Sequence, residues 1–127
     1  MPANSSLSDG WWALWRPAAW LRVTGTDAEA FLQGQFTNDV FNARNGAVYG
    51  LWLDAKGKVR ADSFVLRLGE HEFRVGSYFS AGSTICARLE SHIVADDVSL
   101  EDQTNRWCGI SFAGVNGERL RTKLGLT

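Results

Sequence analysis

The chain has 127 residues, which is enough for one folded domain and short for two. Its hydrophobic content of 45%, with 12% aromatic and 21% charged residues, is typical of a soluble globular protein with a packed core. The formal net charge is −1 and the basic residues are scattered. These numbers exclude a disordered chain, and they exclude nucleic-acid or membrane-surface binding that is driven by charge.

Two cysteines, Cys86 and Cys108, and two histidines are too few and too widely spaced for a zinc or iron–sulfur site built by this chain alone. The number of cysteines alone would allow one disulfide. No secretory signal is recognisable, and no apolar stretch reaches the length of a transmembrane helix. We therefore expect a cytoplasmic, reducing compartment, no metal, no membrane partner, and two thiols packed in the core.

The N-terminal residues 1–17 are predicted to form a partly flexible tail, and residues 18–127 a single domain. Four of the six tryptophans lie in residues 10–20. They suit either an aromatic platform for a planar ligand or partner, or simple packing against the core, and packing is favoured. Pro17 argues against one continuous helix through this segment.

Residues 20–24 alternate as a strand does. Thr26 and Glu29 have the spacing of a capping box, which predicts a helix whose buried face includes Ala28, Phe31, Leu32 and Gln35. Gly34 lies within this helix, and we interpret it as a point where the helix approaches a sheet closely.

Residues 47–54 and 59–68 are predicted to form a hairpin around the turn 55–58, in which Gly57 can take a positive φ. A third strand follows over residues 72–78. Further along, the pattern predicts a helix capped by Ser80 and running to about Ile93, strands over 98–101 and 107–113, and a helix over 117–125. This order of hairpins and helices predicts an α+β fold with a largely antiparallel sheet and two to three helices.

Asp62 is the sharpest functional candidate, because it lies within the second hairpin strand beside Phe64 and Leu66 on what we take to be the apolar face. Burial there would raise its pKa unless hydrogen-bond donors hold the charged form, and such a group could bind a ligand N–H or act as a general base. The alternative is a surface ion pair with Arg60. The residue pattern alone leaves both open.

The usual catalytic motifs are absent, including a dinucleotide-binding glycine motif, a phosphate loop and a nucleophile elbow. The segment from Leu21 to Val40, with the pattern VxGxDAxxFLQGQxTNDV, does resemble the opening of the YgfZ family of folate-binding proteins. That family is related to the T-protein of the glycine cleavage system, an aminomethyltransferase. The resemblance extends over roughly residues 18–115 and includes the hairpin turn after Leu53.

The resemblance implies the first part of a T-protein-like folate-binding domain, with tetrahydrofolate as its ligand. Paired aspartates follow the hairpin turn in aminomethyltransferases, and here Ala61 replaces the first while Asp62 matches the second, which contacts folate. Alignment also points to Tyr49 and Leu51 as pocket residues, and Ser77 stands where T-proteins carry asparagine. No residue of this chain is assigned a catalytic role.

Three functions are then open. The first is a YgfZ-like auxiliary protein that binds tetrahydrofolate and supports iron–sulfur enzymes and tRNA modification. The second is one-carbon transfer by an aminomethyltransferase, and the third is a non-catalytic fragment that binds another protein. The Lys-Gly-Cys motif of the YgfZ family does not occur in this chain. We therefore expect an incomplete domain that could pair with itself or with a C-terminal half.

Overall fold

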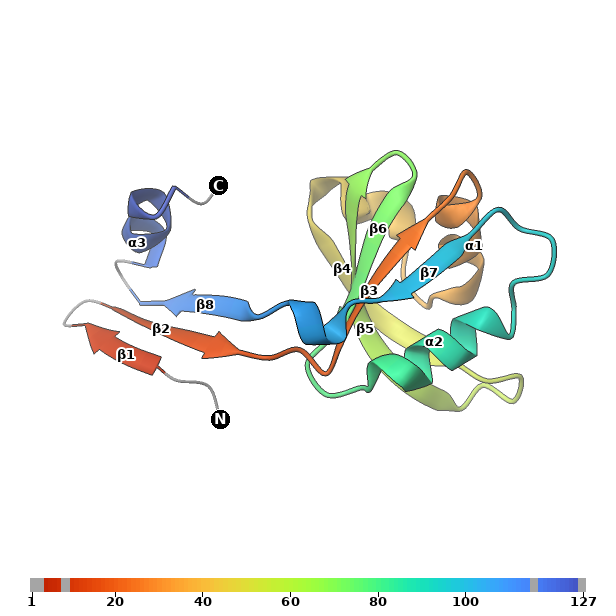
Figure 1. The fold of residues 1–127 in the computed structure, drawn as a ribbon, viewed down its shortest axis with the longest axis horizontal. Coiled ribbons are helices and arrows are strands. Elements are labelled where there is room, and N and C mark those ends of the chain that lie inside the picture. Colours follow the sequence, from red (N-terminus) through yellow and green to blue (C-terminus); the bar gives the residue numbers. More distant parts are fainter. Residues whose placement is uncertain (1–3, 8–9, 115–116, 126–127) are drawn as a thin grey trace. The chain divides into compact units, whose positions relative to one another are not determined.

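A computed structural model describes residues 4–7, 10–114 and 117–125 (Figure 1). These residues gather into two compact units. The larger unit spans Pro17–Arg106, and the smaller one combines residues from 1–16 and 107–127.

The larger unit is built on a five-stranded sheet whose neighbouring strands are all antiparallel. The strand order is β4-β5-β6-β3-β7. The strand that comes first in the sequence of this unit, β3, therefore lies inside the sheet, between β6 and β7. The five strands are β3 (Ala19–Thr24), β4 (Ala47–Leu53), β5 (Val59–Gly69), β6 (Glu72–Ser77) and β7 (Ser99–Asp102).

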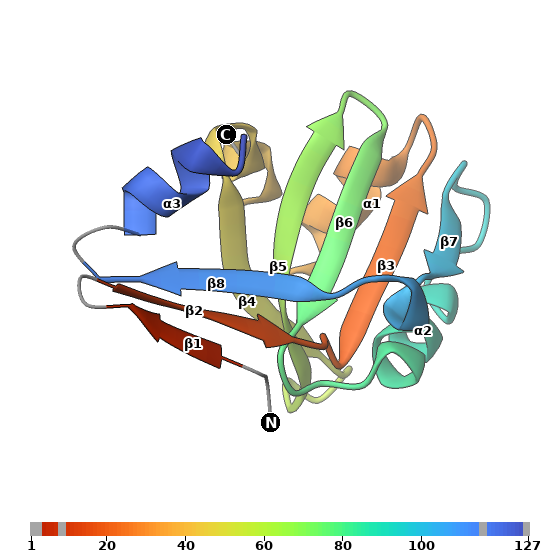
Figure 2. The same ribbon diagram turned by 60° about the vertical axis from the view of Figure 1, so that its left-hand side comes forward.

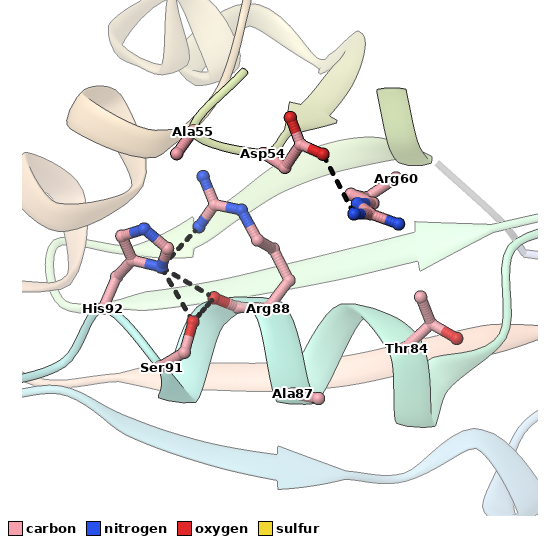
Figure 3. Close-up of a pocket in the computed structure, with 8 residues that line it drawn as sticks. All are labelled: Asp54, Ala55, Arg60, Thr84, Ala87, Arg88, Ser91 and His92. Carbon is pink, nitrogen blue, oxygen red and sulfur yellow. Dashed lines mark hydrogen bonds and ion pairs between the residues drawn. The ribbon is translucent and has the colours of Figure 1, made fainter. Parts of the chain in front are cut away.

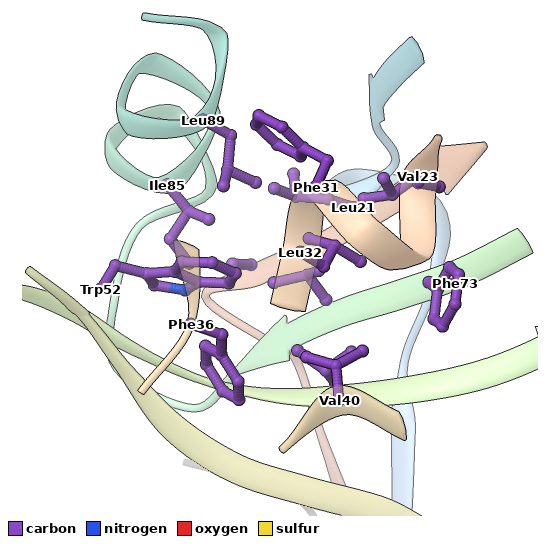
Figure 4. Packing of buried hydrophobic residues seen from close by; sticks show 14 of the residues in the cluster. Leu21, Val23, Phe31, Leu32, Phe36, Val40, Trp52, Phe73, Ile85 and Leu89 are labelled. Atoms are coloured by element: carbon purple, nitrogen blue, oxygen red, sulfur yellow. The ribbon is translucent and has the colours of Figure 1, made fainter. Parts of the chain in front are cut away.

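Two helices, α1 (Ala28–Gln35) and α2 (Gly82–Glu90), contribute to the core on one face of this sheet (Figures 1 and 4). Alternate strand residues point toward them, as the period of two requires. Two short 3₁₀ helices, η1 (Val40–Asn45) and η2 (Thr104–Arg106), complete the unit. The largest fully buried side chains of the core are Trp52, Phe73, Leu21, Leu32, Ile85 and Leu89.

The buried indole of Trp52 also satisfies its polar atom. Its Nε1–H donates to the hydroxyl of Ser63 at 2.8 Å, and both residues are fully buried. An indole N–H that loses water needs such an acceptor. This hydrogen bond ties β4 to β5 on the face that the helices cover.

The smaller unit is a three-stranded antiparallel sheet with one helix (Figure 2). Its strands are β1 (Asn4–Leu7), β2 (Gly10–Trp15) and β8 (Gly109–Ala113), in the order β1-β2-β8, and α3 (Gly117–Lys123) follows β8. Trp15 Nε1 donates to Ser111 Oγ at 2.9 Å. Most of the tryptophan-rich segment thus forms a strand, whereas the assignment of residues 1–17 to a tail and 18–127 to one domain stays a prediction.

Three local expectations were wrong. The capping box does not form, since Asp27 precedes α1 without a side-chain cap bond and the Thr26 hydroxyl donates to Asp97 Oδ2 at 2.7 Å. Gly34 is exposed, and a Cβ there would meet nothing within 4 Å, so it marks no close approach. Cys108 is exposed rather than buried, while Cys86 is half-buried.

The predicted α+β class with antiparallel pairing and three helices is confirmed. The turn of the β4–β5 hairpin also matches, with Gly57 at φ +80°. No helix among the described residues is long and apolar enough to cross a membrane. Nor do residues 4–7, 10–114 and 117–125 hold a group of three or more His, Cys, Asp or Glu side chains placed to bind a metal ion.

Candidate functional site

Asp62 lies in β5 on the face of the sheet opposite the two helices. The buried face of this strand carries Ala61, Ser63 and Val65, all less than 5% exposed. Asp62 and Phe64 are half-buried on the other face. The expectation that Phe64 and Leu66 mark the core side of the strand was therefore wrong, because the helices cover the face with the smaller residues.

Three hydroxyl groups donate to the Asp62 carboxylate. Ser80 Oγ and Ser77 Oγ both donate to Oδ1, at 2.6 and 3.0 Å. Tyr49 Oη donates to Oδ2 at 2.6 Å. An ionised carboxylate has about four acceptor positions, so one position on Oδ2 is left for a further donor.

Ser80 also completes the backbone bonding at this end of β5. The regular pairing of β5 with β6 begins at Phe64, which lies opposite Gly76, so Asp62, two residues earlier in β5, has no partner in β6. The Asp62 N–H instead donates to Ser80 Oγ at 3.0 Å. Ser80 therefore joins the loop after β6 to Asp62 through hydrogen bonds. The prediction that Ser80 caps the second helix was wrong, because α2 begins at Gly82 and Ala81 is the residue before it.

The ion pair considered between Arg60 and Asp62 does not form. Arg60 Nη2 lies 2.9 Å from Asp54 Oδ2. Among the described residues, no cationic side chain forms an ion pair with Asp62, and the donors to its carboxylate are neutral hydroxyls. Within the described part of the chain, the negative charge of Asp62 is thus stabilised by hydroxyl dipoles and has no counter-ion.

These hydroxyls lower the pKa of Asp62 below the ordinary aspartate value, with Ser80 the largest cause and Tyr49 the next. Partial burial acts in the opposite direction and is outweighed. The same bond raises the pKa of Tyr49, whose phenol donates to the carboxylate. Asp62 is therefore an ionised acceptor at neutral pH, and not a general base tuned to titrate near pH 7.

Aromatic rings line the approach to this carboxylate. Tyr49 and Phe64 have ring centroids 5.0 Å apart, Phe64 and Tyr78 5.6 Å, and Tyr78 and Phe79 6.4 Å. Tyr49 is 47% exposed, Tyr78 48% and Phe79 90%. One carboxylate beside partly exposed aromatic side chains is a combination that suits a planar, N–H-bearing ligand.

A family model for the GCVT N-terminal domain matches residues 18–125. The chain belongs to this family. The resemblance to T-protein relatives is thereby confirmed at the level of the family, while its narrower assignment to YgfZ stays a prediction.

Two similar proteins illustrate the family. An aminomethyltransferase of Chlorobium phaeobacteroides (strain DSM 266) is 40% identical over 94 residues, which cover 72% of this chain and 26% of that protein. A crystal structure of the glycine cleavage system aminomethyltransferase T from Bartonella henselae superposes with a TM-score of 0.67 at 18% identity, over 90% of this chain and 32% of that one. The chain thus spans a quarter to a third of the length of these relatives, and the solved structure shows the shared fold.

The four site residues expected from the GCVT resemblance come together in space. Asp62 bonds Tyr49 and Ser77, and Leu51 is its partner in the β4–β5 register. Sequence reasoning missed Ser80, although a serine in the short connection after a strand is a recognisable donor. It also missed the neighbouring rings of Tyr78 and Phe79.

Proposed function

We propose that this chain forms part of a tetrahydrofolate site in which Asp62 accepts an N–H of the ligand. The observation that carries the proposal is an ionised, half-buried carboxylate with one acceptor position left and no ion pair to any described residue. The family match supports the ligand class. Tyr49, Leu51 and Ser77 are proposed as the further contacts.

The chemistry of the donor set fits such a ligand. A reduced pterin presents ring N–H groups and a flat face, and this site offers a carboxylate beside partly exposed aromatic side chains. A carboxylate without a counter-ion also favours positive charge that develops on a nearby nitrogen. Asp62 would orient and polarise the ligand, and it would not exchange protons with it near neutral pH.

The activity proposed for the whole protein is one-carbon transfer to or from tetrahydrofolate, as in an aminomethyltransferase. The support is the name and the 40% identity of the Chlorobium relative. Because the match covers 26% of that relative, the groups that complete the site and perform the chemistry would come from sequence outside the matched part. Pairing of this chain with such a C-terminal half, or with itself, belongs to the same proposal.

A second candidate is a YgfZ-like auxiliary role in iron–sulfur enzyme maintenance and tRNA modification. The segment Leu32-Gln-Gly-Gln35 favours it, since this form of the helix end resembles the YgfZ pattern more than that of true T-proteins. The full reading frame of the gene separates the two candidates. A downstream Lys-Gly-Cys motif would support the auxiliary role, and its absence from the complete frame would favour the transferase.

Titration of the chain with tetrahydrofolate, followed by tryptophan fluorescence, tests the proposed site. We expect saturable quenching, and Asp62→Asn should weaken binding about tenfold or more, because it removes a charge-assisted hydrogen bond. The amide keeps an acceptor oxygen for the serine hydroxyls, so the fold should persist. Thermal unfolding of the variant checks this point.

The matched control is Asp96→Asn, the same change at an exposed loop residue. It should leave the affinity for tetrahydrofolate unchanged. Equal affinities of Asp62→Asn and the wild-type chain would overturn the proposed contact. Absence of saturable quenching would overturn folate binding by this chain and would favour the third alternative, a non-catalytic fragment that binds another protein.

A further inference from the structure

A shallow hollow of about 380 Å³ lies between α2 and the turn that follows β4 (Figure 3). Its lining brings together two guanidinium groups, those of Arg60 and Arg88, and the imidazole of His92. The single carboxylate of the lining belongs to Asp54. Asp62 is not among the lining residues, so this hollow is separate from the proposed folate site.

The charge of Asp54 is already balanced. Its Oδ2 atom pairs with Arg60 Nη2 at 2.9 Å, and its Oδ1 atom accepts the backbone N–H groups of Lys56 and Lys58 at 2.9 and 3.0 Å. These bonds hold the pKa of Asp54 below its usual range, with the Lys58 N–H the largest cause. Asp54 therefore pairs directly with Arg60, and it acts on the second guanidinium, that of Arg88, only through its charge at a distance.

Arg88 is half-buried, and its partners are neutral. Its Nε donates to the Leu53 carbonyl at 2.7 Å, and its Nη1 donates to Gln35 Oε1 at 3.0 Å. Burial lowers the pKa of Arg88, as expected for a cation that loses solvent, and the charge of Asp54 opposes this shift without cancelling it. No carboxylate among the described residues forms an ion pair with it, and Nη2 is left as a donor without a protein partner there.

His92 lies beside the Arg88 guanidinium. Its Nδ1 atom is 2.9 Å from Arg88 Nη1, 2.9 Å from Ser91 Oγ and 3.0 Å from the Arg88 carbonyl oxygen. Nδ1 is thus engaged at the C-terminal end of α2, and Nε2 is the ring nitrogen that is left for a ligand. Figure 3 places the ring of His92 beside the guanidinium at one end of the hollow and Thr84, with its hydroxyl, at the other.

We propose that this hollow binds a small oxyanion, a phosphate or carboxylate group, at its His92 end, through Arg88 and His92. The guanidinium is planar, and neutral acceptors fix two of its nitrogens, so the third is held in place for a ligand oxygen. An anion would supply the direct ion pair that this half-buried cation does not form with the described residues. A free anion and an anionic group of a larger small molecule share this chemistry.

NMR titration of the intact chain with inorganic phosphate and with succinate, at constant ionic strength, tests the site. Saturable amide shifts in the low millimolar range should centre on residues 84–92 and 54–55. His92→Ala should weaken binding about fivefold, the loss expected for one hydrogen bond. The His92 side chain is exposed, so the variant should fold. A preference for phosphate or for succinate assigns the source of the oxyanion.

The matched control for the loss of a histidine is His71→Ala, at the exposed β5–β6 turn. The control for the loss of a positive charge elsewhere on the surface is Arg106→Gln, because Arg106 pairs with Glu101. Both should bind with wild-type affinity. Shifts that do not saturate, or that weaken equally in the controls and in His92→Ala, would mean general screening of charge and would overturn the site. This outcome is independent of the folate titration, because the two sites share no residue.

Discussion

Asp62 is held as an anion by hydroxyl groups, and this choice of partners matters for function. A salt bridge would have neutralised the carboxylate, whereas Ser77, Ser80 and Tyr49 stabilise the charge without cancelling it. The net negative charge is then still available to a ligand. The hydroxyls also fix both oxygens in place, which pre-organises the group before anything binds.

Ser80→Ala should raise the pKa of Asp62 and destabilise the fold by about 1–2 kcal/mol near neutral pH, because it removes a donor to the carboxylate and the acceptor of the Asp62 N–H. The folded pKa of Asp62 lies below its unfolded value of about 3.9. The carboxylate therefore stabilises the fold above that pH, and this stability is lost as pH falls through the folded pKa. The side-chain carbon shift of Asp62, followed by NMR against pH, measures the change.

The control for this prediction is Ser83→Ala, an exposed serine in the first turn of α2. It should leave both the Asp62 pKa and the free energy of unfolding close to wild type. Urea unfolding of Ser80→Ala at pH 7 and below pH 3 adds a second check. A destabilisation of the same size at both pH values would contradict the role of the ionised carboxylate.

At the scale of elements, two glycines predict opposite effects of the same substitution. Gly34 lies inside α1 with open space around it, so Gly34→Ala should stabilise the chain by about 0.5–1 kcal/mol through helix propensity. Gly50 lies in β4, where a Cβ would be 2.7 Å from the Phe36 ring. Gly50→Ala should therefore destabilise the chain, by about 1–3 kcal/mol, because Phe36 must move.

Denaturant unfolding of the two variants beside the wild-type chain measures both effects. The pair controls for any general effect of replacing glycine by alanine. Stabilisation by Gly50→Ala would contradict the tight packing of Phe36 against β4. Destabilisation by Gly34→Ala would mean that α1 has a neighbour at this position.

The elements were predictable because each follows from its own stretch of sequence. Alternation marks β3 and the β4–β5 hairpin, and the spacing of Ile85 and Leu89 marks the buried side of α2. What failed depends on partners far along the chain. Thr26 bonds Asp97 rather than capping α1, and Ser80 bonds Asp62 rather than capping α2.

The face of β5 was misjudged for a similar reason. Phe64 and Leu66 are larger than Ala61 and Ser63, so size alone favoured the wrong side. The helices decide which face is covered, and Ser63 is acceptable inside because it bonds the Trp52 indole. The site residues were found through family resemblance, since no local pattern connects Asp62 with a tyrosine 13 positions earlier.

At the scale of the molecule, the packed core lies in one of the two units. Every member of the buried cluster, from Ala19 to Leu89, lies within residues 17–106, as do Asp62 and its three donors. The smaller unit contributes Ala13 as its buried hydrophobic residue among those described. Hydrophobic burial is the main favourable term in folding, so the larger unit holds most of the stability.

A fragment of residues 17–106 should therefore fold by itself and unfold cooperatively in urea. Leu89→Ala in this fragment should cost about 2–5 kcal/mol, because Leu89 is fully buried in the cluster. Far-UV circular dichroism and tryptophan fluorescence should report one shared transition. Separate transitions, or none, would mean that the strands of residues 4–7, 10–15 and 109–113 are needed for the core to form.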